Sequence, residues 1–308
     1  MRELIVIRTH FYCEATDRLY KYLKETSKRD VVLICDETHG TIDVGPGKAK
    51  LSISENSAKE MGLHVPKKFG WLCGDYSLYA AAELLSAYDR YWLVESDVRI
   101  SFDMSAQFFD SFFCDSTDFL AFHIFKAQDN WFWYKPMCYF EREVYACLFP
   151  VVGISRSAIR FAFERRKEMS ACFEAVVPRD EVRRWPNDES FLTSTLMNNG
   201  FKCQNLDAGE SKFRINGSFN VGLPKSDKRI RGQSPTGLLY HPVHAGHRFV
   251  EKAHAWLSSY TYDNFTKAQL ERAFNSEFLA DLRLEAAEEE YLAFDLRLRA
   301  ATEKANAE

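Results

Sequence analysis

The sequence lacks the cysteine and charge patterns that mark several common classes of protein. None of its eight cysteines forms a C-x-x-C pair, and most stand among apolar neighbours, so we expect reduced thiols rather than a zinc site or a disulfide framework. A basic excess is missing too, because 44 acidic and 40 basic residues give a formal net charge of −4. A general nucleic-acid binder would carry a basic surface, so we expect no nucleic-acid partner.

Long apolar runs and internal repeats are also missing. The longest apolar run, residues 144–154, is too short to cross a bilayer. The first seven residues enter a predicted strand without the apolar core of a signal peptide. We therefore expect a cytoplasmic protein, with peripheral attachment at the inner membrane face left open.

Apolar residues are nevertheless plentiful, at 46% of the 308 residues, which is enough for a substantial core. Short apolar runs alternate with amphipathic segments, as is typical of an α/β fold. The first 36 residues form a β-α-β unit, the start of a nucleotide-binding sheet. The predicted strands are residues 4–7, 31–35, 91–94, 119–125, 151–155 and 201–206, and the predicted helices are 14–26, 76–88, 102–113, 157–168 and 191–198.

The predicted strand 91–94 ends in two carboxylates, Glu95 and Asp97. Their i, i+2 spacing puts both side chains on one face while the backbone is extended. Ligands of open α/β sheets bind just beyond the carboxyl ends of strands. Oxygen donors at this place suit Mg²⁺ or Mn²⁺ carrying a phosphorylated ligand. The plainer interpretation is a strand that ends in a solvated acidic turn.

Polar residues at other strand and helix ends are candidates for binding a nucleotide. Arg8, Thr9 and Asp36 follow predicted strands and are suited to holding a base or ribose. Asp75 precedes the predicted helix 76–88, where backbone N–H groups can meet a phosphate or where Asp75 simply caps the helix. Polar residues are ordinary at such positions whatever the function, and for Asp75 we favour the cap.

Residues 207–238 are polar and rich in Gly, Ser and basic residues, including Lys225 and Arg229. A loop this long in a compact domain is usually a lid or is disordered. We expect the basic stretch 225–231 to be mobile without ligand and to close over a diphosphate. A solvated tether is the alternative.

The segment from Asn187 to Ser190 places two carboxylates just before a predicted helix. One of them should cap the helix, which leaves the other free to act as a general base. Asp188 is the better cap because its short side chain reaches nearby backbone N–H groups. Glu189 is then the predicted base, and the exchanged assignment is the alternative. The aromatic residues of 131–134 are assigned mainly to the core, with an acceptor-binding wall as the alternative.

In their order along the chain, these motifs resemble those of nucleotide-sugar-dependent glycosyltransferases of the GT-A fold. Glu95-Ser96-Asp97 resembles their D-x-D metal motif, with Glu in the first place. Asn187-Asp188-Glu189 resembles the acidic turn that supplies the base in inverting members, and His241 resembles a late histidine that completes the metal shell in some. The resemblance covers roughly residues 1–245 in element order, and these short motifs alone carry it.

The resemblance implies a GT-A-like, Rossmann-type mixed sheet flanked by helices. It also implies a transferase that moves a sugar from a nucleotide-sugar donor to a saccharide or lipid-linked acceptor. Such a reaction would belong to surface polysaccharide or glycan synthesis. Mn²⁺ or Mg²⁺ would be the cofactor. The implied metal ligands are Asp97, Glu95 and His241, the implied base is Glu189 or Asp188, and the donor-binding set is Arg8, Thr9, Asp36, Asp75, Glu95, Lys225 and Arg229.

We expect a GT-A-like domain over residues 1–250 and an amphipathic helical extension over 251–308. The extension could pack on the domain, join subunits or a partner protein, or touch a membrane, which its acidic run 285–290 disfavours. Two other functions stay open. A nucleotidyltransferase acting on sugar phosphates would usually have a glycine-rich loop after the first strand, where Arg8–Phe11 has no glycine. A non-catalytic nucleotide- or glycan-binding module would show no metal-dependent turnover.

Overall fold

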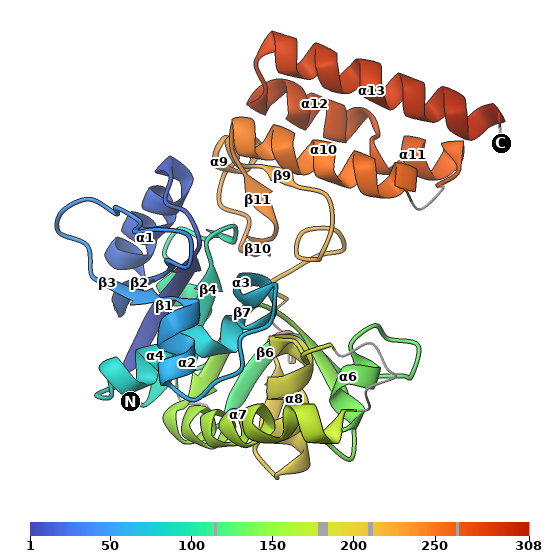
Figure 1. The fold of residues 1–308 in the computed structure, drawn as a ribbon. Coiled ribbons are helices and arrows are strands. Elements are labelled where there is room, and N and C mark those ends of the chain that lie inside the picture. Colours follow the sequence, from blue (N-terminus) through green and yellow to red (C-terminus); the bar gives the residue numbers. More distant parts are fainter. Residues whose placement is uncertain (114–115, 178–183, 209–211, 263–264, 308) are drawn as a thin grey trace. The chain divides into compact units, whose positions relative to one another are not determined.

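The computed structural model describes residues 1–113, 116–177, 184–208, 212–262 and 265–307 (Figure 1). The chain divides into two compact units, of which the first comprises Met1–Ser96 and Met104–Phe213 and the second Asp97–Asp103 and Arg214–Glu308. The helical second unit therefore includes much more of the chain than the extension expected from residue 251 onward.

The first unit is built on a mixed, seven-stranded sheet in the order β3-β2-β1-β4-β7-β6-β8. Only β7 runs opposite to its neighbours β4 and β6, and the other paired strands are parallel. This sheet with flanking helices confirms the predicted α/β class. The strands are β1 (Glu3–Thr9), β2 (Asp30–Asp36), β3 (Lys50–Ile53), β4 (Arg90–Glu95), β6 (Phe119–Lys126), β7 (Tyr145–Ser155) and β8 (Cys203–Asn205).

Alternating side chains of the central strands pack on opposite faces of this sheet, as the strand period requires. Tyr91 and Leu93 of β4 belong to the large core shared with α4 and α7. Trp92, between them, contacts the rings of Phe108 and Phe109 on α5. Because both faces of the sheet are covered at β4, the sequence of this strand is a continuous apolar run. The helices of this unit are α1 (Glu14–Thr26), α2 (Glu55–Glu60), α3 (Phe69–Leu72), α4 (Gly74–Leu84), α5 (Ala106–Asp110), α6 (Tyr134–Cys138), α7 (Arg156–Val176) and α8 (Asp188–Asn198).

Two predicted helices of the first unit differ most from the structure. The helix expected over 102–113 is reduced to α5, because the chain before it forms β5 (Arg99–Ser101), which pairs with β10 (Leu238–Tyr240) in the second unit. The helix expected over 157–168 continues to Val176 as part of α7. The basic residues of this segment, Arg160, Arg165 and Arg166, predict a solvated face, but the side chain of Arg166 is fully buried.

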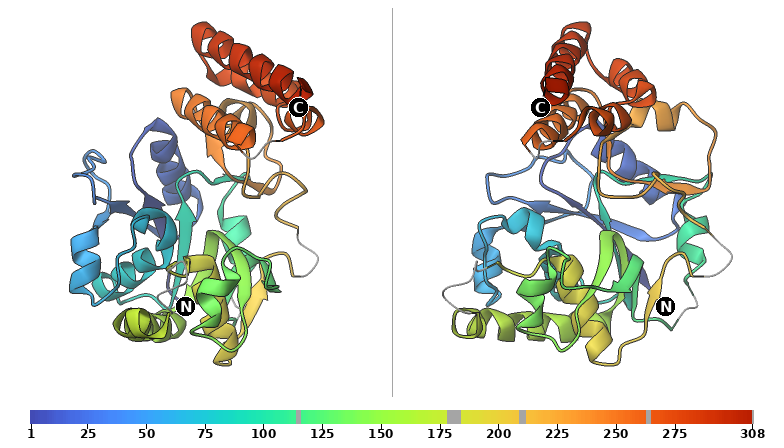
Figure 2. Two further views of the ribbon diagram at one scale, coloured as in Figure 1. Left: turned by 45° about the vertical axis from the view of Figure 1, so that its right-hand side comes forward. Right: turned by 90° about the vertical axis from the view of Figure 1, so that its right-hand side faces the viewer.

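The second unit holds two small two-stranded sheets and the C-terminal helices, which Figures 1 and 2 show gathered in one group. The helices enclose a core of their own, in which Phe249, Phe274, Phe278 and Phe294 pack together. The predicted C-terminal helical region is thus confirmed. Its helices are α9 (Asp227–Arg231), α10 (His247–Tyr262), α11 (Lys267–Ala273), α12 (Ser276–Glu285) and α13 (Glu288–Ala307).

The basic stretch 225–231 is not the mobile lid that its composition predicts. It forms β9 (Lys225–Ser226), which pairs with β11 (Val243–His244), followed by α9. The side chain of Ser226 caps α9 by accepting a hydrogen bond from the backbone N–H of Arg229. Asp227 is fully buried and forms ion pairs with Arg99 at 2.7 Å and with Arg231 at 2.9 Å. The polar side chains of this segment form hydrogen bonds and ion pairs, so the segment is ordered although its composition is polar.

Two further findings concern disulfide bonds and membrane-spanning helices. No disulfide joins the seven cysteines that lie in the described residues. Among the described helices, none combines the length and the apolar character needed to span a bilayer.

Candidate functional site

In the first unit, the carboxyl ends of β1 and β4 bring together an arginine and a carboxylate. Arg8 lies opposite Glu95 in the register of the two strands, and their side chains form an ion pair of 2.5 Å. Arg8 also donates to the backbone carbonyl of Gly70. Burial opposes the charge of Arg8, but the carboxylates of Glu95 and Asp188 outweigh it and raise the pKa of the guanidinium. Glu95, a predicted metal ligand, is therefore held by Arg8.

The helix α8 begins at this same place, and its cap differs from the predicted one. Asn187 has an extended backbone, and its side-chain oxygen accepts from the N–H of Ser190 at 3.1 Å. The prediction that Asp188 caps the helix is wrong, because Asp188 lies one residue inside it. Its carboxylate instead accepts from the N–H groups of Gly74, at 2.9 Å, and Glu189, at 2.8 Å.

Asp188 is buried, and burial, followed by the charge of Glu189, raises the pKa of its carboxyl well above the usual range. The close approach of Asp188 to Gly74 requires glycine there. A Cβ at this position would lie 2.5 Å from the Asp188 carboxylate and 2.8 Å from the ring of Phe149. This backbone contact fixes where α8 begins and hence where Glu189 stands.

Glu189, the predicted base, is the better placed of the two carboxylates for proton transfer. It is partly exposed, and its carboxylate accepts from the side-chain amide of Asn187 at 3.1 Å. Burial raises its pKa to about 7, although hydrogen bonds from Asn187 and the backbone of Phe149 act in the opposite direction. A general base works best when its pKa lies near the operating pH, so the environment of Glu189 suits the predicted role.

Three other residues predicted to bind the donor make contacts within the first unit. Asp75 is fully buried, forms a 2.9 Å ion pair with Arg166 and accepts from the hydroxyl of Tyr79 at 2.9 Å. It neither caps α4, whose N-cap is Cys73, nor has a surface for a ligand. Both predictions for Asp75 are therefore wrong.

Thr9 and Asp36 differ from each other in exposure. Thr9 is buried, and its hydroxyl bonds to the backbone of Phe11, which leaves it no surface for a ligand. Asp36 is half-buried and accepts from the N–H of Thr38 at 3.1 Å. A donor-binding role for Asp36 stays a prediction.

The second unit brings Asp97 and His241 together and adds His244. The Nε2 atom of His241 lies 3.5 Å from one carboxylate oxygen of Asp97, and Nε2 of His244 lies 3.8 Å from the other. The backbone positions these groups, because the N–H of Val243 donates to the carbonyl of Asp97 at 2.7 Å. Burial opposes ionisation of Asp97, but the two imidazoles lower its pKa. Burial lowers the pKa of His244 to about 4, which makes this ring neutral at pH 7.

The hydrogen bonding of His241 determines which ring nitrogen faces Asp97. Its Nδ1 lies 2.8 Å from the backbone carbonyl of Asn220, which can only accept, so Nδ1 carries the proton. A neutral ring would turn the lone pair of Nε2 toward a carboxylate, an unfavourable pairing that either a proton on Nε2 or a cation between the two groups relieves. A carbonyl partner on the far nitrogen is also the usual support of a metal-bound histidine.

The separations of the donor atoms are slightly wider than a bound ion would need. Ligands at about 2.1 Å from an octahedral ion lie roughly 3 Å apart. Within the described residues, no three His, Cys, Asp or Glu side chains stand close enough to form a metal-binding group. The donor set of Asp97, His241 and His244 therefore has the chemistry of a divalent-cation site, but in this structure its side chains are not close enough to coordinate one ion.

Two lysines of the second unit interact with Asp97. Lys225, on β9, donates to the carbonyl of His241 at 2.7 Å, and burial lowers its pKa to about 8 although the charge of Asp97 acts against this. Lys252, on α10, has a pKa lowered by burial and by Arg248, again opposed by Asp97. One carboxylate with two lysines suits an anionic ligand such as a diphosphate.

His244 and Lys252 were not predicted as site residues from the sequence. The signal for His244 was its place three residues after His241 in the motif His-Pro-Val-His. Lys252 gave no signal, because it looks like any other charge on an amphipathic helix. Arg229, a predicted donor-binding residue, forms an ion pair with Asp281 and donates to the backbone of α12. It links α9 to α12, and the prediction that it serves a mobile lid is wrong.

An aromatic patch of the first unit surrounds the end of α3. Trp71 is 62% exposed and Phe132 56%, although both are large aromatic residues that usually bury most of their surface. Both pack on Trp133, with ring centroids 5.6 and 4.7 Å away. Trp133 is buried, as the core assignment predicted, whereas Phe132 is not. The guanidinium of Arg184 lies over Phe132 at 4.2 Å.

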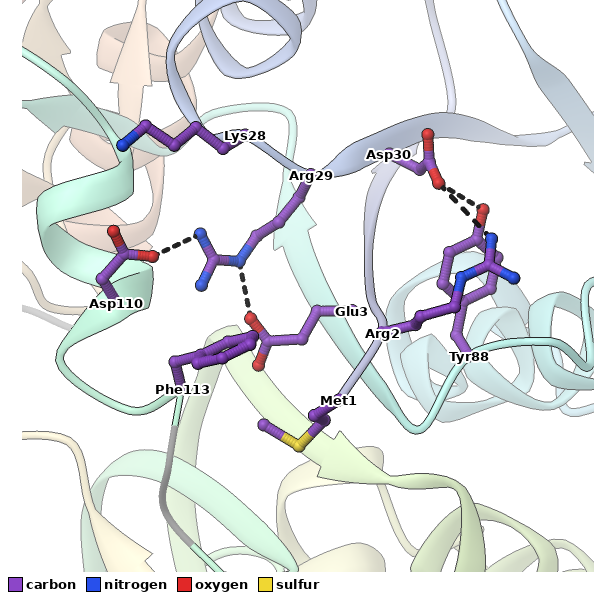
Figure 3. A pocket seen from close by; sticks show the side chains of 9 residues that line it. All are labelled: Met1, Arg2, Glu3, Lys28, Arg29, Asp30, Tyr88, Asp110 and Phe113. Carbon is purple, nitrogen blue, oxygen red and sulfur yellow. Dashed lines mark hydrogen bonds and ion pairs between the residues drawn. The ribbon is translucent and has the colours of Figure 1, made fainter.

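A pocket of about 740 Å³ lies at the opposite ends of the strands, where β1 and β2 begin (Figure 3). Its charged groups pair with each other, as Arg29 does with Glu3 at 2.6 Å and with Asp110 at 2.9 Å. Ligands of α/β sheets bind beyond the carboxyl ends of strands, so this pocket is a poor candidate for the site.

Comparison with known proteins places the chain in no family. No family model and no curated protein matches its sequence. Among solved structures, one similar chain is a glycosyltransferase involved in the glycosylation of the major capsid of PBCV-1, with 12% identity and a TM-score of 0.36 over 79% of this chain and 92% of that one. Another is A197 from STIV, with 12% identity and a TM-score of 0.33 over 67% of this chain and 81% of that one.

Proposed function

We propose that this chain is a glycosyltransferase that moves a sugar from a nucleotide-sugar donor to a saccharide or lipid-linked acceptor. The observation that carries the proposal is the group in which Asp97 faces the imidazole nitrogens of His241 and His244 beside Lys225. A carboxylate, two imidazoles and neighbouring ammonium groups form a set that binds a divalent cation together with an anion. A nucleoside diphosphate with Mn²⁺ or Mg²⁺ has this chemistry.

Each group has a role that its surroundings support. Asp97, His241 and His244 would hold the cation, which supplies charge neutralisation for a departing diphosphate. Lys225 and Lys252 bind the phosphates. Their lowered pKa values reflect burial, and an anion would offset the cost of burying their charge.

For the acceptor we assign Glu189, Trp71 and Phe132. Glu189 accepts the proton of the acceptor hydroxyl, which makes the oxygen nucleophilic as it attacks the anomeric carbon. A base of this kind belongs to an inverting reaction. The bonds of Asp188 to the N–H groups of Gly74 and Glu189 fix the start of α8 and so the position of Glu189. The exposed faces of Trp71 and Phe132 offer flat apolar surfaces for the C–H face of a sugar ring.

Calorimetry with a panel of nucleotide sugars, with and without Mn²⁺, tests the donor side. We expect at least one nucleotide sugar to bind only when Mn²⁺ is present, and Asp97→Asn to weaken this binding by at least about tenfold because one full negative charge on the cation is lost. Asp103→Asn, the same change at an exposed position of the same segment, should bind like the wild type.

Three results would contradict the donor assignment. Binding that is unaffected by chelator would remove the cation from the site. Equal losses in both aspartate variants would show a general effect of charge. Turnover of a sugar phosphate with a nucleoside triphosphate, in place of sugar transfer, would identify a nucleotidyltransferase.

A second experiment tests the acceptor side once a donor is known. Trp71→Ala should raise the acceptor KM by about tenfold, because an indole face that stacks on a sugar is lost. The rate at which water hydrolyses the donor should be unchanged, since the substitution leaves the donor groups intact. Phe113→Ala, which removes a different exposed ring, is the matched control. An unchanged KM, or an equal loss of donor hydrolysis, would place the acceptor elsewhere.

A further inference from the structure

The last helix of the chain, α13, presents an apolar stripe on its outward face. It packs on α10, α11 and α12, and Figure 1 shows it as the outermost helix of the second unit. Tyr291 and Phe294 face the core, whereas Leu292 is 50% exposed and Leu296 is 68% exposed. These two leucines stand one helical turn apart on the same face. Ala293 and Ala300 are exposed beside them and leave room for a close approach.

The charges that flank the stripe are arranged symmetrically but with opposite sign. Glu289 lies three residues before Leu292, and Arg299 lies three residues after Leu296, on the same face of the helix. Both are exposed. Among the described residues, the ion-pair partner of Arg299 is Asp295 of its own helix, at 2.8 Å on the surface, and a contact of this kind contributes little to stability.

This pattern is complementary to itself when a second copy runs antiparallel. We place the twofold axis at the level of Phe294. Leu292 of each copy then contacts Leu296 of the other copy, which gives two leucine layers. On either side of these two layers, Glu289 of one copy meets Arg299 of the other. A parallel arrangement would instead place Glu289 against Glu289 and Arg299 against Arg299.

We propose that α13 is a homodimerisation helix, and that two copies of this chain associate through an antiparallel, twofold pair of α13 helices. The symmetric spacing of leucines and opposite charges favours a second copy over an unrelated protein, because an isologous interface needs a surface that complements itself. The acidic first turn, Glu288–Glu290, disfavours an anionic membrane as the occupant. The proposal does not depend on the enzymatic function.

The expected dimer is weak and reversible. The helix has 20 residues and is therefore about 30 Å long, and its exposed large apolar side chains are Leu292 and Leu296, whereas a standard interface buries roughly 800 Å² per partner. We expect a dissociation constant of about 10–100 µM, measurable by sedimentation velocity of the full chain over about 5–500 µM in low salt.

Two kinds of variant test the interface. Leu296→Glu should abolish the dimer, because it would place a carboxylate in each leucine layer. Glu289→Arg alone and Arg299→Glu alone should each weaken association by about tenfold, since each replaces two attractive contacts with two repulsive ones. An equimolar mixture of these two charge variants should recover dimers, because a mixed pair again sets opposite charges against each other.

Matched controls separate the interface from changes in net charge or folding. Glu271→Arg and Arg272→Glu make the same charge changes at exposed positions of α11 and should leave association unchanged. All variants should keep the thermal midpoint of the wild type. A wild type that is monomeric at 500 µM, on the order of ten times the expected dissociation constant, would overturn the proposal. So would a dimer that Leu296→Glu does not disrupt, or a mixture of the charge variants that stays monomeric.

Discussion

Replacing Glu189 with glutamine is expected to lower kcat by about 10²–10⁴-fold while the binding of the donor stays unchanged. Glutamine keeps the size and the polarity of the side chain but cannot take a proton from the acceptor hydroxyl. The donor groups around Asp97 belong to the other unit of the chain and keep their contacts. Pre-steady-state kinetics for kcat and calorimetry for donor affinity provide the two measurements.

The pH dependence of Glu189 gives a second test with a definite sign. Because its pKa is raised to about 7, kcat/KM should rise with pH to a plateau above about pH 7 as the carboxylate ionises. Stability should change in the opposite direction. A carboxyl with a raised pKa favours the folded state when it is protonated. Its stabilisation of the folded state is therefore fully present below its unfolded pKa of about 4.5 and is lost as the pH rises through about 7. Both effects should disappear in the glutamine variant.

Asp188→Asn is the matched comparison for Glu189→Gln. Asparagine has one acceptor where the carboxylate has two, so one of the bonds to Gly74 and Glu189 is lost, at a cost of about 1 kcal/mol in stability. Turnover should largely persist. If the asparagine variant loses turnover and the glutamine variant keeps it, Asp188 is the base. If both variants turn over normally, an inverting reaction loses its base, and a retaining reaction becomes the better interpretation.

Replacing Arg166 with methionine is expected to cost about 3–5 kcal/mol in the free energy of unfolding. Its guanidinium and the Asp75 carboxylate are both fully shielded from solvent and form a 2.9 Å ion pair. Arg166 also donates to the carbonyl of Pro186 at 3.0 Å and stacks on Phe191 at 3.9 Å. Without the arginine, Asp75 would be a buried charge without a counter-ion.

Urea denaturation measures this cost, and the neighbouring residue gives the control. Arg165→Met removes the same side chain at a position where it is 39% exposed, and should change stability by less than about 0.5 kcal/mol. Adding Asp75→Leu to Arg166→Met should recover part of the loss, because the unpaired charge is then gone. Equal effects of the two arginine variants would show that the buried pair contributes little.

The elements of the sheet could be predicted from the sequence because local patterns determine them. The apolar run 4–7 lies within β1, and the amphipathic pattern of 14–26 matches the bounds of α1. The partners of the polar residues could not be predicted. Arg166 and Asp75 are 91 residues apart, and the basic residues clustered on its helix predicted a solvated position for Arg166.

Parts of the candidate site were predictable for the same reason. Asp97 and His241 carry motif-like signals in the sequence, and the structure brings them together. The engagement of Glu95 by Arg8 depends on the register of two strands, which no local pattern specifies. The order of 225–231 depends on Asp227 meeting Arg99, 128 residues away, and on α12, so composition alone predicted a loop.

The interleaving of the two units has a consequence for synthesis on the ribosome. Residues 97–103 leave the exit tunnel early, but their partners in the second unit, β10 and α9, are made more than 100 residues later, as the separation of 128 residues between Arg99 and Asp227 shows. The sheet of the first unit can assemble during that interval, since domains generally fold in order of emergence. Until β10 and α9 are made, the segment with Asp97 is a loop that lacks these partners. The candidate cation site is thus completed only after translation has passed residue 244, and a nascent chain stalled before that point would lack it.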